Sequence, residues 1–145
     1  MTGYLTRGAV AAALTLMMAG TAWADVAPGT YSLRSVSRAG CVGNSMAPVS
    51  LVACGSSDSA WIVDADGAPG YTIGYDGQCL TSDDGRVWID SCTGMRNQAF
   101  DIRSVGDGLA IVNTSGKLLT AATDRVTAAA SGVSGQVWAL VPLGA

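Results

Sequence analysis

The chain has 145 residues and a formal net charge of −3, from eight Lys and Arg against eleven Asp and Glu, and it contains no His. Without His, Ser-His-Asp and Cys-His catalysis is unavailable within one chain. Without Glu, a paired-carboxylate hydrolase would depend on Asp alone. Nucleic-acid binding normally requires a basic face that displaces phosphate counterions, and no basic excess exists here. We therefore predict that the chain is not an enzyme and binds no nucleic acid.

The first 24 residues have the pattern of a secretory signal peptide. Arg7 supplies a positive charge, residues 8–20 are apolar and uncharged, and a small-x-small cleavage site ends at Ala24. The apolar part is too short to span a bilayer comfortably, and no later uncharged apolar run approaches the roughly 18 residues of a membrane span. We predict cleavage near Ala24, a secreted or periplasmic protein, no membrane span, and a single domain over residues 25–145.

The composition after this leader favours an all-β fold. The whole chain has one Lys, no Glu and 19 Gly. Glu and Lys favour helices, whereas Gly, Asp and Ser favour turns and Thr, Val, Trp and Tyr favour strands. No stretch after residue 24 shows convincing 3.6-residue periodicity. Residues 118–130 are rich in Ala and Thr, but they align with a predicted strand pair earlier in the chain. We therefore predict two strands there rather than a helix.

A local pattern passes down the chain three times, at a period of about 38 to 40 residues. Each pass has two positions thirteen residues apart, followed by a tripeptide that ends in an aromatic residue. The three passes are Cys41, Cys54 and Ser59-Ala60-Trp61; Cys79, Cys92 and Gln98-Ala99-Phe100; and Leu118, Ser131 and Gln136-Val137-Trp138. Such a period indicates a repeat architecture, and three units suggest a closed assembly. The repeats cover about residues 28–66, 67–106 and 107–143.

Each repeat is predicted to contain four short strands with period-2 alternation. In the second repeat the strands are expected at residues 71–74, 79–81, 86–90 and 99–102. Asp-Gly dipeptides separate the first three of them, and this dipeptide tolerates the positive φ that tight hairpin turns require.

Four cysteines in an exported chain indicate two disulfides. Four cysteines allow three connectivities, and the repeat symmetry selects Cys41–Cys54 and Cys79–Cys92, each closing the same hairpin in its own repeat. Each bridge is expected to stabilise the fold by roughly 3 kcal/mol in the chain-entropy model. A four-Cys zinc site would need closely spaced cysteine pairs, which the sequence lacks. We predict no metal and no cofactor.

The second repeat carries the clearest family resemblance. Its succession of Gly-x-Cys-Leu, Val-x-Ile, Cys and the tetrapeptide at residues 97–100 resembles one repeat of the ricin-type lectin family, which repeats a Gln-x-Trp motif three times in a β-trefoil. The resemblance covers residues 28–143, although Gln-x-Trp is intact only in the third repeat. It implies a β-trefoil of three four-stranded repeats with pseudo-threefold symmetry, six strands forming a short barrel and six a triangular cap. Trp61, Phe100 and Trp138 are then the threefold core.

The resemblance also implies where a sugar would bind. In the family an Asp lies two positions after the first cysteine of a repeat, an aromatic residue two positions before the second, and an Asn just before the Gln. The Asp positions here are Gly43, Thr81 and Thr120, and the aromatic positions are Val52, Asp90 and Ala129. Only the second repeat keeps the Asn. We therefore predict that any sugar site lies in this repeat and uses Asp83, Asp84, Trp88, Asp90, Asn97 and Gln98.

Two non-catalytic functions remain open at this point. The first is a secreted carbohydrate-binding module with degenerate sugar pockets, which binds a glycan or glycoprotein and is the recognition partner of a toxin or hydrolase. The alternative is a protein-binding trefoil, such as a protease inhibitor or an assembly subunit. Trefoils support both functions, so the fold alone does not choose between them.

Overall fold

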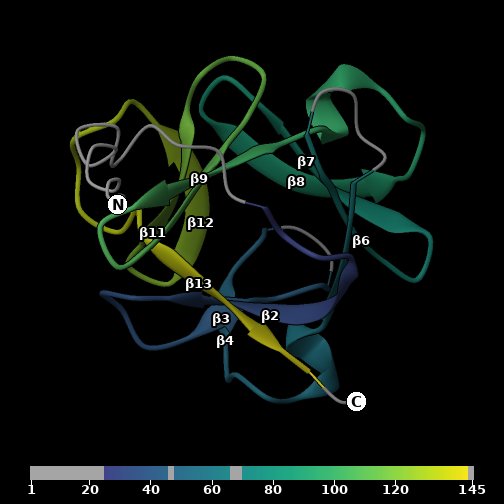
Figure 1. The fold of residues 1–145 in the computed structure, drawn as a ribbon, viewed down its shortest axis with the longest axis horizontal. Coiled ribbons are helices and arrows are strands. Elements are labelled where there is room, and N and C mark those ends of the chain that lie inside the picture. Colours follow the sequence, from purple (N-terminus) through teal and green to yellow (C-terminus); the bar gives the residue numbers. More distant parts are fainter. Residues whose placement is uncertain (1–24, 46–47, 66–69, 144–145) are drawn as a thin grey trace, which may run out of the picture.

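The computed structural model describes residues 25–45, 48–65 and 70–143, and Figure 1 shows their fold. The predicted signal peptide falls on residues 1–24, outside the described part. The described residues contain twelve strands and two single-turn 3-10 helices, η2 (Ser57–Ser59) and η3 (Arg96–Gln98), and no α-helix. Within this part of the chain, no helix has the length and apolar character needed to cross a membrane.

Each repeat supplies four strands, as predicted. The first supplies β2 (Gly29–Ser35), β3 (Cys41–Val42), β4 (Leu51–Val52) and β5 (Trp61–Asp64). The second supplies β6 (Thr72–Tyr75), β7 (Gln78–Asp83), β8 (Arg86–Ser91) and β9 (Asp101–Val105). The third supplies β10 (Gly108–Val112), β11 (Leu118–Ala122), β12 (Arg125–Ala129) and β13 (Trp138–Pro142). The last hairpin confirms that residues 118–130 form strands rather than a helix.

The first and last strands of the repeats close into a six-stranded ring. β2 pairs with β5 and with β13, β5 pairs with β6, and β10 pairs with β9 and β13, all antiparallel. An isolated bridge between Tyr71 and Phe100, just before β6 and β9, completes the ring. The ring is a short barrel without free edges along this path, which protects its strands from pairing with other chains.

The middle strands form three hairpins, β3–β4, β7–β8 and β11–β12, that cap the barrel. Backbone hydrogen bonds join the hairpins to one another: the Val126 N–H donates to the Val49 carbonyl over 2.9 Å, and the Ala128 N–H donates to the Gly85 carbonyl over 3.2 Å. Barrel and cap together are the β-trefoil architecture that the three repeats predict.

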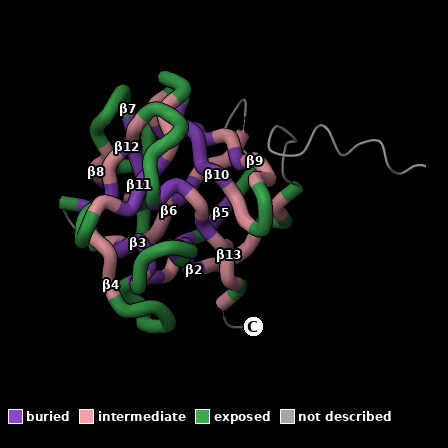
Figure 2. Tube along the Cα trace, turned by 90° about the vertical axis from the view of Figure 1, so that its left-hand side faces the viewer, coloured by how far each residue is buried: buried purple, intermediate pink, exposed green. Residues whose placement is uncertain are grey.

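The core lies where the barrel meets the cap, and Figure 2 shows the contrast between this buried interior and the exposed loops. Trp61, Phe100 and Trp138 are 0%, 1% and 0% exposed. The indole N–H of Trp61 donates to the Val42 carbonyl, and that of Trp138 to the Leu119 carbonyl, each over 3.0 Å. A buried indole N–H needs such a partner. Phe100 fills the third equivalent position without one.

The strand boundaries differ from the prediction at the end of the second repeat. β9 begins at Asp101 rather than at Ala99, because residues 96–98 form the turn η3 and the Ala99 N–H still donates to the carbonyl of its first residue, Arg96. The tight turn between β6 and β7 is as predicted: Asp76 and Gly77 both have positive φ, 54° and 78°, the combination that a two-residue type I′ hairpin requires.

Both disulfides join cysteines thirteen residues apart within one repeat, Cys41–Cys54 and Cys79–Cys92. Each one links the start of the cap hairpin to the loop that precedes the buried aromatic residue. The third repeat has Leu118 and Ser131 at these positions and therefore has no such link.

Candidate functional site

The predicted site residues of the second repeat separate into three environments. Asp83 and Asn97 line one hollow, which also contains Gly94, Met95, Arg96 and Thr114 and is called the second-repeat hollow below. Trp88 lines a different hollow. Asp84, Asp90 and Gln98 line neither of them. The structure therefore brings Asp83 and Asn97 together and places Trp88 elsewhere.

The second-repeat hollow is shallow, open to solvent, and about 610 Å³ in volume. Its polar groups are a carboxylate, a guanidinium, a carboxamide and a hydroxyl, from Asp83, Arg96, Asn97 and Thr114. Within the described residues, no hydrogen bond uses the Asn97 side-chain amide, although this residue is partly buried. An amide in this state can both donate to and accept from a ligand. Met95, 61% exposed, adds apolar surface to the rim.

Asp83 and Asp84 are fixed by the neighbouring loop of the third repeat. The Ser115 hydroxyl donates to an Asp83 carboxylate oxygen over 3.2 Å and accepts from the Asp84 N–H over 3.0 Å. The Asn113 amide donates to the Asp84 carbonyl over 3.0 Å, and the Lys117 ammonium lies 3.5 Å from the Asp84 carboxylate. Asp84 has φ +51° and forms the hairpin turn. The Asp83 carboxylate is thus held at the hollow while its other acceptor positions stay available.

Gln98 is buried, and its carboxamide is used inside the protein. Its Nε2 donates to the Ser91 carbonyl over 2.8 Å and to the Thr81 hydroxyl over 3.2 Å, while its Oε1 accepts from the Thr93 N–H over 2.8 Å. The side chain is 3% exposed. Because all of these groups belong to the loop and the β7–β8 hairpin, Gln98 holds the loop that presents Asn97.

The positions at which the ricin-type family carries its Asp are all buried. Gly43 is buried, Thr81 is 1% exposed and Thr120 is 5% exposed. The hydroxyls of the two threonines accept hydrogen bonds from the amides of Gln98 and Gln136, each over 3.2 Å. In both repeats the Thr and the Gln therefore form an internal pair.

Asp90 and Trp88 lie on β8, opposite Cys79 and Thr81 of β7. Asp90 is exposed, and its carboxylate accepts the N–H of the next residue over 2.9 Å. The Trp88 ring is stacked by the Arg86 guanidinium, whose central carbon is 4.6 Å from the ring centroid. Trp88 is thus an aromatic side chain with a cation over it rather than a bare platform.

Sequence reasoning missed Met95, Arg96 and Thr114. Five residues lie between Cys92 and Gln98, whereas four lie between the equivalent positions in the first and third repeats. This one-residue insertion in the loop before Gln98 was a usable signal for Met95 and Arg96. Thr114 had none, because it belongs to the third repeat and only the tertiary fold brings it to this loop.

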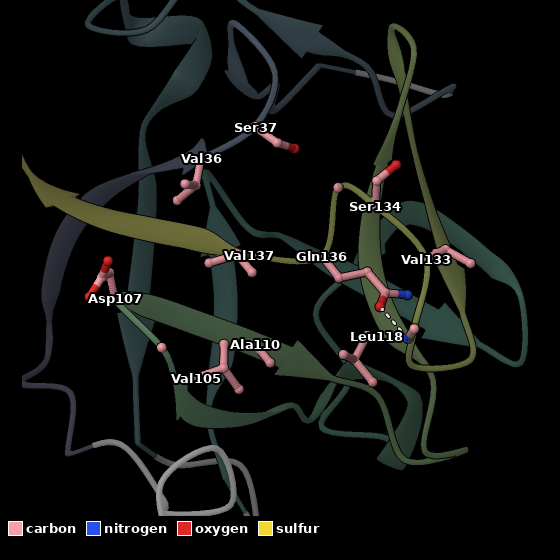
Figure 3. A pocket seen from close by; sticks show the side chains of 13 residues that line it. Val36, Ser37, Val105, Asp107, Ala110, Leu118, Val133, Ser134, Gln136 and Val137 are labelled. Atoms are coloured by element: carbon pink, nitrogen blue, oxygen red, sulfur yellow. Dashed lines mark hydrogen bonds between the residues drawn. The ribbon is translucent and has the colours of Figure 1, made fainter.

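Another hollow contains none of the predicted sugar-site residues and is lined mostly by the third repeat, with Val36 and Ser37 from the first repeat and Val105 and Gly106 from the end of the second. Figure 3 shows this third-repeat hollow, about 670 Å³ in volume. Most of its surface is aliphatic, from Val36, Val105, Ala110, Leu118, Val133 and Val137. The Gln136 carboxamide at its back accepts the Gly132 N–H over 3.1 Å, and Asp107 lies at its edge. No aromatic side chain is among the described residues that line it.

The described residues contain no group of three His, Cys, Asp or Glu side chains that could hold a metal ion.

Comparison with solved structures defines the class as a β-trefoil. The structure of SeviL bound to asialo-GM1 saccharide matches 81% of this chain and 100% of its own, with a TM-score of 0.73 at 15% identity. The Vibrio vulnificus hemolysin/cytolysin β-trefoil lectin with N-acetyl-D-lactosamine bound matches 83% and 98%, with a TM-score of 0.64 at 19% identity. The cytolethal distending toxin from Actinobacillus actinomycetemcomitans matches 81% and 94%, with a TM-score of 0.65 at 15% identity. At these identities the likeness establishes the fold alone.

The sequence itself matches one family model. Residues 31–106 match the family described as ECU07_1090, N-terminal domain, and the chain belongs to this family. No curated protein matches the sequence. The family description carries no activity, so the function has to be argued from the site.

Proposed function

We propose that this protein is an exported, non-catalytic carbohydrate-binding module and that the second-repeat hollow is its sugar site. The observation that carries the proposal is the Asn97 amide, partly buried and without a partner among the described residues, beside the Asp83 carboxylate and the Arg96 guanidinium. Sugars are held by such forks of amide and charged groups. Two of the similar structures contain a bound saccharide, which supports the same class of ligand.

The site differs from the one that the family resemblance predicts. The Asp83 carboxylate replaces the Asp that the family carries elsewhere in the repeat. The exposed Met95 side chain replaces the aromatic platform and offers apolar surface to the C–H face of a sugar ring. A thioether contact is weaker than aromatic stacking. We therefore expect a single weak site, with a Kd on the order of a millimolar.

A role as the recognition partner of a toxin or hydrolase fits this proposal. The likeness to a cytolethal distending toxin structure covers 94% of that chain at 15% identity, so it supports the shared fold, while the recognition role rests on the proposed sugar site. The two disulfides suit an oxidising, extracellular location.

Titration of neutral methyl glycosides against backbone amide NMR signals tests the proposal. We expect shifts on residues 81–98 and around Thr114, and their loss in Asn97→Ala, whose side chain supports no internal hydrogen bond. Ser134→Ala is the control, because Ser134 lies in the corresponding loop of the third repeat and does not line the second-repeat hollow. Shifts that survive Asn97→Ala, or no shifts with any neutral sugar, would overturn it.

Binding of a protein partner is the second candidate function, and the third-repeat hollow favours it. Val36 and Val133 at this hollow are 54% and 52% exposed, and Asp107 has no ion-pair partner among the described residues. Aliphatic surface beside one carboxylate fits a peptide segment with an aliphatic side chain next to a Lys or Arg. A peptide-display selection that is counter-selected with Val133→Asp should enrich that pattern. If the enriched peptides lack an aliphatic side chain next to a Lys or Arg, the protein-binding candidate is wrong. That result would not bear on the proposed sugar site.

A further inference from the structure

A small hollow lies where the three cap hairpins meet, and it shares no lining residue with the second-repeat hollow or the third-repeat hollow. It is about 230 Å³ in volume. Its lining residues are Pro48, Val49, Gly85, Arg86, Val87, Trp88, Arg125, Val126 and Thr127. All three repeats contribute, so it is called the axial hollow below. Pockets for drug-sized ligands run from roughly 300 to 1,000 Å³, so this one suits a single small chemical group.

The repeat pattern places two arginines at equivalent positions of this hollow. Pro48, Arg86 and Arg125 each lie seven residues after the first cysteine position of their repeat. The hairpins meet around the pseudo-threefold axis, so equivalent side chains converge there. Two of the three are guanidinium groups, and the third is a proline that adds no charge. Symmetry thus places two positive charges, both on exposed residues, at the same hollow.

Among the described residues neither guanidinium forms an ion pair, although Arg86 lies opposite Asp83 in the β7–β8 register. None of the residues that line the axial hollow is acidic. Among the described residues, the ion pairs are Arg103–Asp101 and Lys117–Asp84, and neither involves Arg86 or Arg125.

The acidic residues adjoining these arginines in sequence are turned to other partners or lie outside the hollow. Asp83 faces the second-repeat hollow and accepts from Ser115, and Asp84 pairs with Lys117. Asp124 precedes Arg125 but does not line the axial hollow. Two cations in a chain of net negative charge are therefore left for a ligand.

Stacking leaves the Arg86 donors free to bind. The central carbon of its guanidinium lies 4.6 Å from the centroid of the Trp88 ring, a cation–π contact, and no hydrogen bond among the described residues uses its side-chain N–H groups. The N–H groups lie in the guanidinium plane and point outward, and their fork matches the oxygens of a carboxylate or sulfate. The half-buried ring also restrains the Arg86 side chain, which lowers the entropy lost on binding.

We propose that the axial hollow binds a single oxyanion group, held by Arg86 and Arg125. This group is the carboxylate or sulfate of an acidic sugar unit or a free anion of the same chemistry. The inference is independent of the neutral-sugar site, because the two hollows share no lining residue. It assigns Trp88 a positioning role for Arg86 instead of a role as a sugar platform.

Three probes at constant ionic strength test this: methyl β-D-glucuronide, methyl β-D-glucoside as its neutral match, and sodium sulfate. Trp61 and Trp138 are fully buried, so a fluorescence change after removal of the leader reports on Trp88. We expect the glucuronide to change this fluorescence and to shift amide signals at residues 85–88 and 125–127. If sulfate binds as tightly as the glucuronide, the ligand of the axial hollow is a free anion. If the glucuronide binds more tightly than sulfate, the ligand is an acidic sugar unit. No response to either anion, or an equal response to the glucoside, would overturn the inference.

Variants separate this site from the sugar site. Arg125→Gln and Arg86→Gln should each weaken glucuronide binding by at least about tenfold, since a charged hydrogen bond is lost. Arg34→Gln is the control, because Arg34 is exposed on β2 and lines none of the described hollows. Asn97→Ala should leave glucuronide binding unchanged while it removes neutral-sugar binding. Unchanged glucuronide affinity in Arg125→Gln would overturn the inference even if the neutral-sugar site is real.

Discussion

The second and third repeats hold the same loop in two different ways. In both, a buried Gln donates to a Thr hydroxyl over 3.2 Å, Gln98 to Thr81 and Gln136 to Thr120. Both amides also accept an N–H from their own loop. The second repeat adds the disulfide Cys79–Cys92, and the third repeat has no link there. The Gln network is therefore sufficient to define the loop, and the disulfide is an additional restraint on it.

This difference affects what each loop presents. With the bridge, the second-repeat loop carries an extra residue and displays Met95, Arg96 and Asn97 in an open polar hollow. Without it, Leu118 replaces the first cysteine and its side chain lines an aliphatic hollow. One scaffold thus offers a polar surface suited to hydroxyl groups and an apolar surface suited to an aliphatic side chain.

The core that both repeats share should be the most sensitive part. Trp138→Ala should lower the free energy of unfolding by about 3 to 5 kcal/mol, because it removes a fully buried ring and leaves the Leu119 carbonyl without its partner. Urea denaturation of the purified protein measures the change. Phe100→Ala is the comparison in the second repeat, where no side-chain hydrogen bond is lost. A Trp138→Ala protein of native stability would mean that this residue is not part of the core.

Removal of the disulfide Cys79–Cys92 should leave the second-repeat loop restrained by the Gln98 hydrogen bonds alone, as the third-repeat loop is restrained by those of Gln136. Cys79→Ser with Cys92→Ser should cost roughly 3 kcal/mol in the chain-entropy model. The Thr93 N–H, which donates to Gln98, should then exchange with solvent faster, because only the Gln network still restrains the loop. Amide hydrogen exchange and thermal melting measure both effects. An unchanged exchange rate at Thr93 would show that the bridge does not restrain this loop.

The reverse change should give the third repeat a bridge. Leu118→Cys with Ser131→Cys places cysteines at the positions equivalent to Cys79 and Cys92. We expect a disulfide and an increase of about 2 kcal/mol in the free energy of unfolding. This is the stabilisation from the closed loop minus the hydrophobic free energy lost with the Leu118 side chain. Non-reducing peptide mapping and melting with and without reductant check this. Two free thiols in the folded variant would contradict the equivalence of the two loops.

The smallest effect is expected where the third repeat contacts the second through an exposed ion pair. Lys117 and Asp84 are 3.5 Å apart, with side chains 36% and 80% exposed. Lys117→Ala should therefore change the free energy of unfolding by less than about 1 kcal/mol. Asn113→Ala in the same loop is the contrast, because its buried amide bonds both Ser82 and Asp84. Equal costs for the two variants would mean that the ion pair, and not the buried amide, joins the repeats.

The repeat pattern predicted three equivalent units, and the resemblance to the ricin-type family predicted their β-trefoil arrangement. Three equally spaced patterns specify three equivalent units, and the buried aromatic and Gln positions recur because each unit faces the same axis. Local chemistry also determined the hairpin at Asp76-Gly77, where a two-residue turn needs positive φ at both positions. The start of β9 was less predictable, because the turn η3 depends on hydrogen bonds that the Gln98 side chain makes to a distant hairpin.

Only the tertiary structure decided which side chains share a site. The sequence offered six candidates in the second repeat, but Gln98 is turned inward, Trp88 lies under Arg86 in the axial hollow, and Thr114 arrives from another repeat. The physical reason is that the hollows lie between repeats rather than within them. A repeat pattern specifies each unit and its inward face, whereas the neighbours of an outward-facing side chain depend on how three unequal units pack together.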